Sequence, residues 1–107
     1  MSIWATLPVD VQPSLSLMDW MVYELPDGDR HLVGFCPENA EGRVSSRISL
    51  FDKSAMCAVT GSGRVYKLVG KPGNSFHSDA HYTWQRWCKM WGVEGYEDVS
   101  GEYLEDL

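Results

Sequence analysis

The sequence contains no apolar run as long as the roughly 18 residues that a membrane-spanning helix needs. Its first 17 residues, MSIWATLPVDVQPSLSL, also lack the basic start and the continuous apolar stretch of a secretory signal. These absences predict a soluble protein of the cytoplasm. With 107 residues, 44% of them hydrophobic, the chain is expected to fold as a single domain around its own core.

Cysteine is scarce as well: Cys36, Cys57 and Cys88 are odd in number and widely spaced, and no CxxC pair occurs. This pattern favours buried, reduced thiols over a disulfide framework or a zinc ribbon. Zinc accepts imidazole and thiolate, so His77 and His81 could join the cysteines in a metal site. However, His81 and Cys88 would stand about 10.5 Å apart along a helix, too far for one ion or for a Cys-His nucleophile pair. We predict no metal, no cofactor and no enzyme activity.

Positive charge is absent from both ends of the chain. All nine Lys and Arg residues fall within residues 30–89, which carry a net +5, whereas residues 1–29 carry −5 and residues 90–107 carry −6. The total of −6 argues against unaided binding to nucleic acid. The segregated charges are either neutralised within the fold or leave an acidic surface that attracts a basic partner.

Aromatic residues, by contrast, are plentiful, and they concentrate in residues 78–92. Ala80, Trp84, Trp87 and Trp91 recur at a spacing that places them within about 60° of one another on a helix. Ser78 can cap the start of this helix, and Gly92 can end it. The pattern predicts one amphipathic helix whose three indoles are buried against a sheet as the main core.

Strand and turn patterns fill the rest of the chain. DWMVYEL and RHLVGF flank the turn PDGD as a hairpin with its tip at Asp27-Gly28, and RVSSRISLFD, AMCAVT and RVYKLVG follow as further strands. The expected fold class is α+β: an antiparallel β-meander of four to five strands with one aromatic-faced α-helix packed on one face. Residues 1–17 are expected to form an extended arm, Tyr96 to Val99 a short strand, and residues 100–107 an acidic end.

Residues 43–52 alternate with a period of two, which is typical of a strand with two different faces. The predicted dry face holds Val44, Ser46, Ile48 and Leu50, and the predicted basic, solvent-facing side holds Arg43, Ser45, Arg47 and Ser49.

The basic side offers a candidate ligand site. Arg43 and Arg47, with Arg64 after the glycine-rich residues 60–63, could bind a phosphate or a nucleotide. The plainer interpretation is a solvated strand face beside an ordinary hairpin turn, because the turn lacks the lysine and the following helix of a P-loop. A ligand-binding domain or small enzyme that uses these three arginines is kept as the alternative hypothesis.

Three blocks, GRVSSRISLFD, SGRVYKLVGKPG and DAHYTWQRW, resemble a group of short proteins carried on phages, plasmids and integrative elements of proteobacteria. The resemblance extends over residues 20–100 and brings no catalytic residues with it. It implies a role inside a bacterial host cell, where small accessory proteins of mobile elements act on host or rival machinery. Inhibitors of CRISPR-Cas and of other defence systems are one such class.

The acidic residues of the two flanks form the leading candidate site: Asp27, Asp29, Glu94, Glu97, Asp98 and Glu102. Together they could imitate the charge of a nucleic acid backbone and occupy a basic groove. The alternative is a solvated terminus that keeps the protein soluble. The leading hypothesis is a non-enzymatic binding protein whose partner is a larger protein or protein–RNA complex of the host. Self-association as a homodimer is left open.

Overall fold

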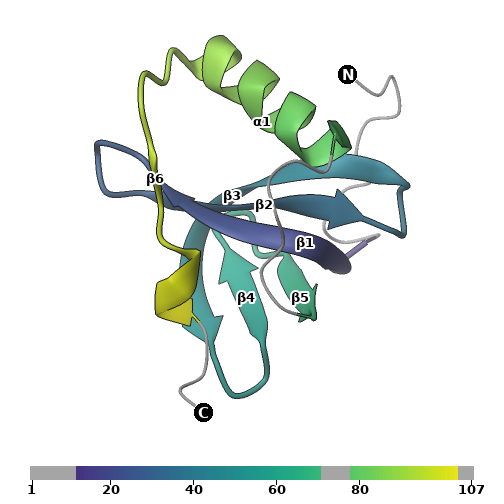
Figure 1. Ribbon diagram of the computed structural model, residues 1–107. Helices are drawn as coiled ribbons and strands as arrows, with labels where there is room; N and C mark the ends of the chain where they lie inside the picture. Colours follow the sequence, from purple (N-terminus) through teal and green to yellow (C-terminus); the bar gives the residue numbers. More distant parts are fainter. Residues whose placement is uncertain (1–11, 71–77, 104–107) are drawn as a thin grey trace.

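The computed structural model describes residues 12–70 and 78–103. In chain order the elements are β1 (Ser14–Glu24), β2 (Arg30–Cys36), β3 (Glu41–Asp52), β4 (Cys57–Thr60), β5 (Val65–Val69), α1 (Ser78–Trp91), β6 (Glu97–Asp98) and the 3-10 helix η1 (Ser100–Tyr103). Figure 1 shows a curled sheet with α1 lying across its outside. The predicted α+β class with one helix is confirmed.

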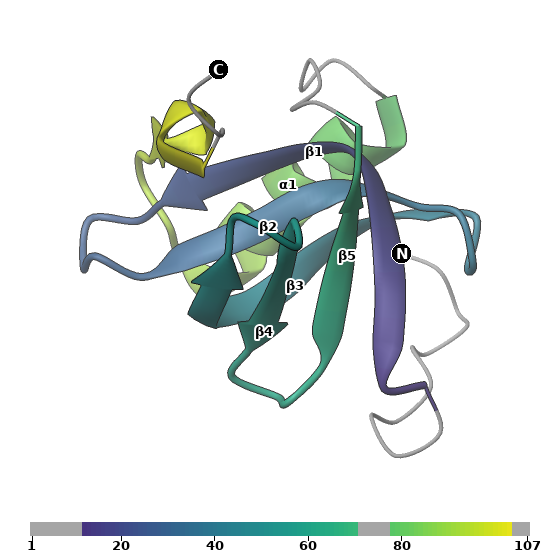
Figure 2. The same cartoon turned by 90° about the horizontal axis from the view of Figure 1, so that it is seen from below.

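Strand β1 closes the sheet into a barrel. Residues 14–18 of β1 run parallel to β5, and residues 21–24 run antiparallel to β2. Since β2, β3, β4 and β5 follow one another as antiparallel neighbours, five strands close on themselves, and β6 adds to the end of β1 (Figure 2). The meander is therefore a closed barrel, a form that leaves few unpaired strand edges.

A bulge in β1 allows this strand to pair with β5 along its first half and with β2 along its second half. The register with β2 shifts between Met18 and Met21, where Asp19 has a positive φ of 50°. Gly34 of β2 lies against the bulge: a Cβ at this position would be 2.9 Å from the carbonyl oxygen of Met18. The close approach of the two backbones therefore requires glycine here.

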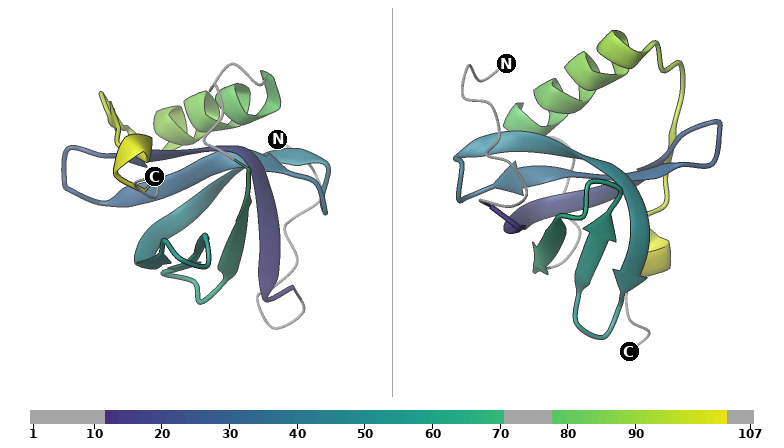
Figure 3. Two further views of the ribbon diagram at one scale, coloured as in Figure 1. Left: turned by 60° about the horizontal axis from the view of Figure 1, so that its bottom comes forward. Right: turned by 180° about the vertical axis from the view of Figure 1, so that it is seen from behind.

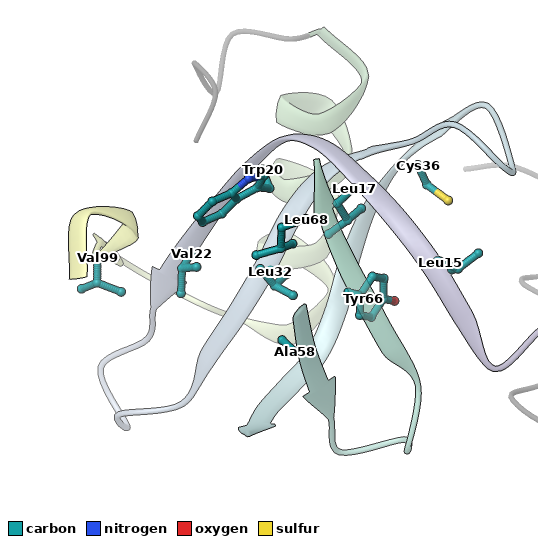
Figure 4. Close-up of a cluster of buried hydrophobic side chains, with 10 residues drawn as sticks. All are labelled: Leu15, Leu17, Trp20, Val22, Leu32, Cys36, Ala58, Tyr66, Leu68 and Val99. Carbon is teal, nitrogen blue, oxygen red and sulfur yellow. The ribbon is translucent and has the colours of Figure 1, made fainter. Parts of the chain in front are cut away.

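The main core is the barrel interior, and it contains no residue of α1. Its largest side chain is that of Trp20, which is fully buried and donates its indole Nε1–H to the carbonyl of Gly70 at 3.0 Å. Figure 4 shows the interior cluster, which consists of Leu15, Leu17, Trp20, Val22, Leu32, Cys36, Ala58, Tyr66, Leu68 and Val99. Because α1 lies outside the closed barrel, its side chains cannot reach the barrel interior.

A second cluster joins α1 to the outer face of β1 and β2 through Met21, Tyr23, Leu25, Val33, Ala80 and Trp84. Of the three indoles predicted to be buried, Trp84 is 1% exposed, Trp87 is half-buried and Trp91 is 66% exposed. The expectation is therefore wrong for Trp91. Figure 1 shows the reason, since the carboxyl end of α1 rises away from the sheet.

The faces of β3 also differ from the predicted alternation. The register shifts between the pairs His31–Arg47 and Val33–Val44, and shifts again before Leu50. As a result Val44 packs against the cluster under α1, Ile48 packs against the barrel interior, and Leu50 is 65% exposed. Ser45, expected in solvent, is buried. Each shift adds a residue to one strand and so exchanges inside for outside.

Both ends of the described part of the chain pack against the barrel. Strand β1 begins at Ser14, so Leu15 and Leu17 of the expected arm belong to the core. At the other end Ser100 is buried and Tyr103 packs against Phe51, at 4.3 Å between ring centroids. Residues 1–11 and 104–107 lie outside the described part. No described helix has the length and apolar character needed to cross a membrane.

Candidate binding surface

The two acidic flanks of the sequence meet at one end of the barrel. Strand β6 pairs with the last residues of β1, which sets Glu97 opposite Glu24 and Asp98 opposite Tyr23. The β1–β2 turn, with Asp27 and Asp29, follows directly, and Figure 1 shows β6 crossing beside this hairpin. We call this surface the acidic end; its carboxylates are Glu24, Asp27, Asp29, Glu94, Glu97, Asp98 and Glu102.

Some of these carboxylates hold the local fold together. Asp27 Oδ1 accepts the backbone N–H of Asp29 at 2.9 Å and so closes the turn, in which Gly28 has a φ of 93°. Asp98 Oδ1 accepts the backbone N–H of Ser100 at 2.9 Å and caps the start of η1. Both residues are nevertheless exposed on their outer side, so their charge still contributes to the surface.

Arg30 is the one cation in the two acidic stretches, residues 24–30 and 92–103. Its guanidinium lies 2.8 Å from Glu24 and 3.1 Å from Glu102, donates to the Tyr103 hydroxyl at 2.8 Å and sits 5.6 Å from the centre of that ring. The hydrogen bond to Tyr103, followed by that to Glu24, raises the pKa of Arg30 further above its usual value. This single charge is therefore fully engaged by its neighbours.

Glu94 and Glu97 are both exposed, and within the described residues neither forms an ion pair. Arg30 thus neutralises the part of the acidic end near η1 and leaves the part near β6 uncompensated. Unpaired carboxylates in water cost the fold little and are free to bind a cation from another molecule.

A row of aromatic rings begins beside these two glutamates. Tyr96 contacts Tyr23 at 4.7 Å and Trp84 at 5.1 Å between centroids, Trp84 stacks on Trp87 at 5.3 Å, and Trp87 contacts Trp91 at 6.2 Å. Within the row Tyr23 and Trp84 are buried and Trp87 is half-buried, while Tyr96 is 45% and Trp91 66% exposed at its two ends. The Trp84 indole N–H is buried and meets no acceptor among the described atoms. We call this set the aromatic row.

The three arginines of the alternative site serve different parts of the barrel. Arg43 Nε donates to the Tyr66 hydroxyl at 2.6 Å, and Arg64, which is buried, donates its Nε–H to the carbonyl of Gln12 at 3.0 Å. Arg47 is exposed beside Gly61 of the 60–64 turn. That turn is a hairpin turn between β4 and β5, as the plainer interpretation predicted. Arg43 and Arg64 are thus committed to the fold.

The cysteines lie in three separate elements: Cys36 in β2, Cys57 in β4 and Cys88 in α1. Burial raises the pKa values of the Cys36 and Cys88 thiols, which keeps both protonated near neutral pH. His77 lies outside the described residues. Within those residues, no group of three or more His, Cys, Asp or Glu side chains could hold a metal ion.

Sequence reasoning missed Arg30, Tyr96 and Trp91 as members of this surface. Tyr96 had a detectable signal, since it is an isolated aromatic residue inside the polar stretch EGYED. Helical spacing predicts Trp91 in the core, but spacing does not show where a helix leaves its sheet. Arg30 carried no local signal because its partners come from distant segments.

The class defined by these observations is a small closed β-barrel with one external helix and an acidic, aromatic surface at one end. The chain matches no known family model, and comparison with curated proteins and with solved structures finds no match. The resemblance to proteins of mobile elements therefore stays a prediction.

Proposed function

We propose that this protein is a non-enzymatic binding protein that engages a basic surface of a larger protein or protein–RNA complex through the acidic end and the exposed rings beside it. The observation that carries the proposal is the position of Glu94 and Glu97, which are exposed, unpaired with any described cation and next to the half-exposed ring of Tyr96. Carboxylates beside an aromatic face suit arginine, which pairs with the former and stacks on the latter.

The chain's own Arg30 supports this choice of partner chemistry. Its guanidinium is held by two carboxylates and lies over the Tyr103 ring at the same end of the molecule. An arginine of the partner that reached Tyr96 would meet the same combination of groups in Glu97 and Glu94. The surrounding negative charge would also speed association with a basic partner, and salt would weaken that effect.

The resemblance to proteins of phages, plasmids and integrative elements suggests what the partner does. Defence complexes that bind nucleic acid present basic grooves, and an acidic protein can occupy such a groove in place of the nucleic acid. We therefore infer an anti-defence role in the bacterial cytoplasm, with CRISPR-Cas effectors as the first partners to test.

The binding surface is tested with a matched pair of variants. The double variant Glu94→Gln, Glu97→Gln removes two charges from the acidic end, and Asp19→Asn, Glu41→Gln removes two charges elsewhere. The probe is a labelled arginine-rich peptide, followed by fluorescence anisotropy at low salt. We expect the first variant to lose about tenfold in affinity, equivalent to about 1.4 kcal/mol, and the control to keep wild-type affinity. Equal losses in both variants would show that binding follows net charge and not this surface.

The biological role is tested by phage plating on a host that carries an active CRISPR-Cas system. Expression of the wild-type chain should raise plating efficiency, and the Glu94→Gln, Glu97→Gln variant should not. If the wild-type chain leaves plating unchanged while the peptide still binds the acidic end, the inferred role is wrong and the binding surface stands.

A further inference from the structure

The outer face of β3, β4 and β5 carries two ordered rows of side chains. Cross-strand pairing aligns Leu50, Val59 and Val65 in one row, and Asp52, Cys57 and Lys67 in the next. The intervening row points inward, since Ala58 and Tyr66 belong to the barrel interior and Phe51 packs against it. The first row is apolar, and the second runs from an acid through a thiol to a base.

This face is open in the described structure. Leu50 is 65% exposed, Val59 and Val65 are half-buried, and Asp52 and Lys67 are exposed. The helix α1 packs on β2 and on β3 near Val44, and both views of Figure 3 show β4 and β5 lying away from the helix. A leucine exposed on a strand beside two valines forms a continuous apolar strip, which is typical of an interaction surface.

The charged row has the symmetry of a surface that pairs with itself. Consider two copies packed face to face about a two-fold axis that runs along β4. The axis lays β3 of one copy over β5 of the other, so Asp52 faces Lys67 of the second copy at both edges. Leu50 then covers Val65 of the second copy, and Val59 and Cys57 each meet their own counterparts. Within one chain Asp52 and Lys67 lie two strand spacings apart, about 9.6 Å, too far to pair directly.

We propose that this face mediates a symmetric homodimer, with β4 on the two-fold axis and two Asp52–Lys67 ion pairs at its edges. Isologous contact requires that every group meet its complement after the two-fold rotation, and both rows meet this condition. Face-to-face packing of sheets within about 30° of alignment is the usual geometry for such a contact. The barrel curves away beyond these three strands, so the interface is small and the dimer is weak.

An unlike partner is the competing occupant. The two-fold axis along β4 exchanges the positions of Asp52 and Lys67. A symmetric dimer needs opposite charges at these two positions, whereas an unlike partner does not. The dimer uses neither Glu94 nor Glu97, so it leaves both acidic ends free and makes the protein bivalent.

Sedimentation velocity across protein concentrations up to about 1 mM measures the association directly. The wild-type chain should shift from monomer toward dimer as concentration rises, and Leu50→Asp should remain monomeric with an unchanged melting temperature. A wild-type chain that stays monomeric throughout, or a dimer that Leu50→Asp leaves intact, overturns the proposal.

Charge reversal distinguishes this dimer from any other. Asp52→Lys alone and Lys67→Asp alone each place like charges together at both edges, and each should weaken association about tenfold. The double variant Asp52→Lys, Lys67→Asp restores both pairs and should recover wild-type association. Failure of the double variant to recover would show that these residues do not face one another across the axis.

Discussion

Glu38, in the turn between β2 and β3, ties that turn to β1. Its carboxylate accepts the backbone N–H of Ser16 at 3.0 Å and the Ser16 hydroxyl at 2.8 Å. Partial burial alone would raise the pKa of Glu38, but the hydrogen bonds from Ser16 outweigh it and lower the pKa below its ordinary value. The ionised form is therefore the one that stabilises the fold.

The pH dependence of the stability follows from the lowered pKa of Glu38. A carboxyl group whose pKa is lower in the folded state contributes stability above its unfolded pKa, and that contribution is lost as pH falls through the folded pKa. Because Glu38 is exposed and solvent screens its hydrogen bonds, we expect Glu38→Ala to lower the free energy of unfolding by only about 0.5 kcal/mol at pH 7, and by less below about pH 4. Urea unfolding at pH 7 and pH 3 measures the difference in free energy of unfolding between the wild-type chain and Glu38→Ala, with Glu94→Gln as the control. A difference that is as large at pH 3 as at pH 7 would contradict this account.

Gly34 gives a second prediction at the residue scale. A Cβ there would lie 2.9 Å from the Met18 carbonyl oxygen and 3.1 Å from Trp20 Cα, and both contacts are backbone atoms that cannot rotate away. Gly34→Ala should therefore cost about 2–3 kcal/mol through overpacking. Gly101→Ala is the matched control, because nothing lies within 4 Å of its Cβ position. Thermal unfolding measures the comparison. Equal losses of melting temperature in the two variants would disprove the close approach of β1 and β2.

At the scale of elements, β3 depends on the bulge that buries Ser45. The Ser45 hydroxyl accepts the backbone N–H of Leu32 at 2.9 Å and donates to the carbonyl of Ser46. It thus satisfies a backbone donor at the point where the β2–β3 register shifts. Buried backbone groups left without a partner are costly, so the bulge and this serine belong together.

Ser45→Ala should lower the free energy of unfolding by about 1–3 kcal/mol, because the Leu32 N–H then loses its acceptor. Ser49→Ala on the same strand is exposed and should change stability by less than about 0.5 kcal/mol. Chemical denaturation of the two variants makes the comparison. If both changes proved equally mild, the period-two alternation predicted from the sequence, which places both serines in solvent, would be right and the bulge wrong.

Local patterns were enough to predict which segments become strands, turns and the helix. The hairpin tip at Asp27-Gly28 and the helix over residues 78–91 both follow from residues adjacent in the chain. The faces of β3 could not be predicted, because a bulge depends on the register of the neighbouring strand and leaves no periodic signal. Barrel closure was missed for the same reason, since the β1–β5 pair joins distant segments.

The candidate site was predictable in part. Charge segregation indicated that acids of both flanks act together, and β6 does bring Glu97 beside Glu24. Helical spacing alone could not separate buried Trp84 from exposed Trp91, because it gives the angle of a side chain and not the distance of the helix from its sheet. The role of Arg30 could not be predicted from the sequence, because its partners Glu102 and Tyr103 are distant in the chain.

At the scale of the whole molecule, the basic middle of the chain neutralises only part of the acidic end, through Arg30. Arg43 and Arg64 are bonded within the barrel to Tyr66 and to the Gln12 carbonyl, and of the nine cations in the sequence Arg30 supplies the described ion pairs at the acidic end. The described structure therefore has two separate surfaces: the acidic, aromatic end that we propose for a basic partner, and the open sheet face that we propose for a second copy.

The most direct test of the proposed surface is a nuclear magnetic resonance titration of the isotope-labelled protein with an arginine-rich peptide. The amide signals of Glu94, Tyr96 and Glu97 and the indole signal of Trp91 should shift first and furthest, and added salt should reverse these shifts. Shifts confined to Arg43, Arg47 and Lys67, or spread evenly over the barrel, would contradict the assignment of the acidic end as the binding surface.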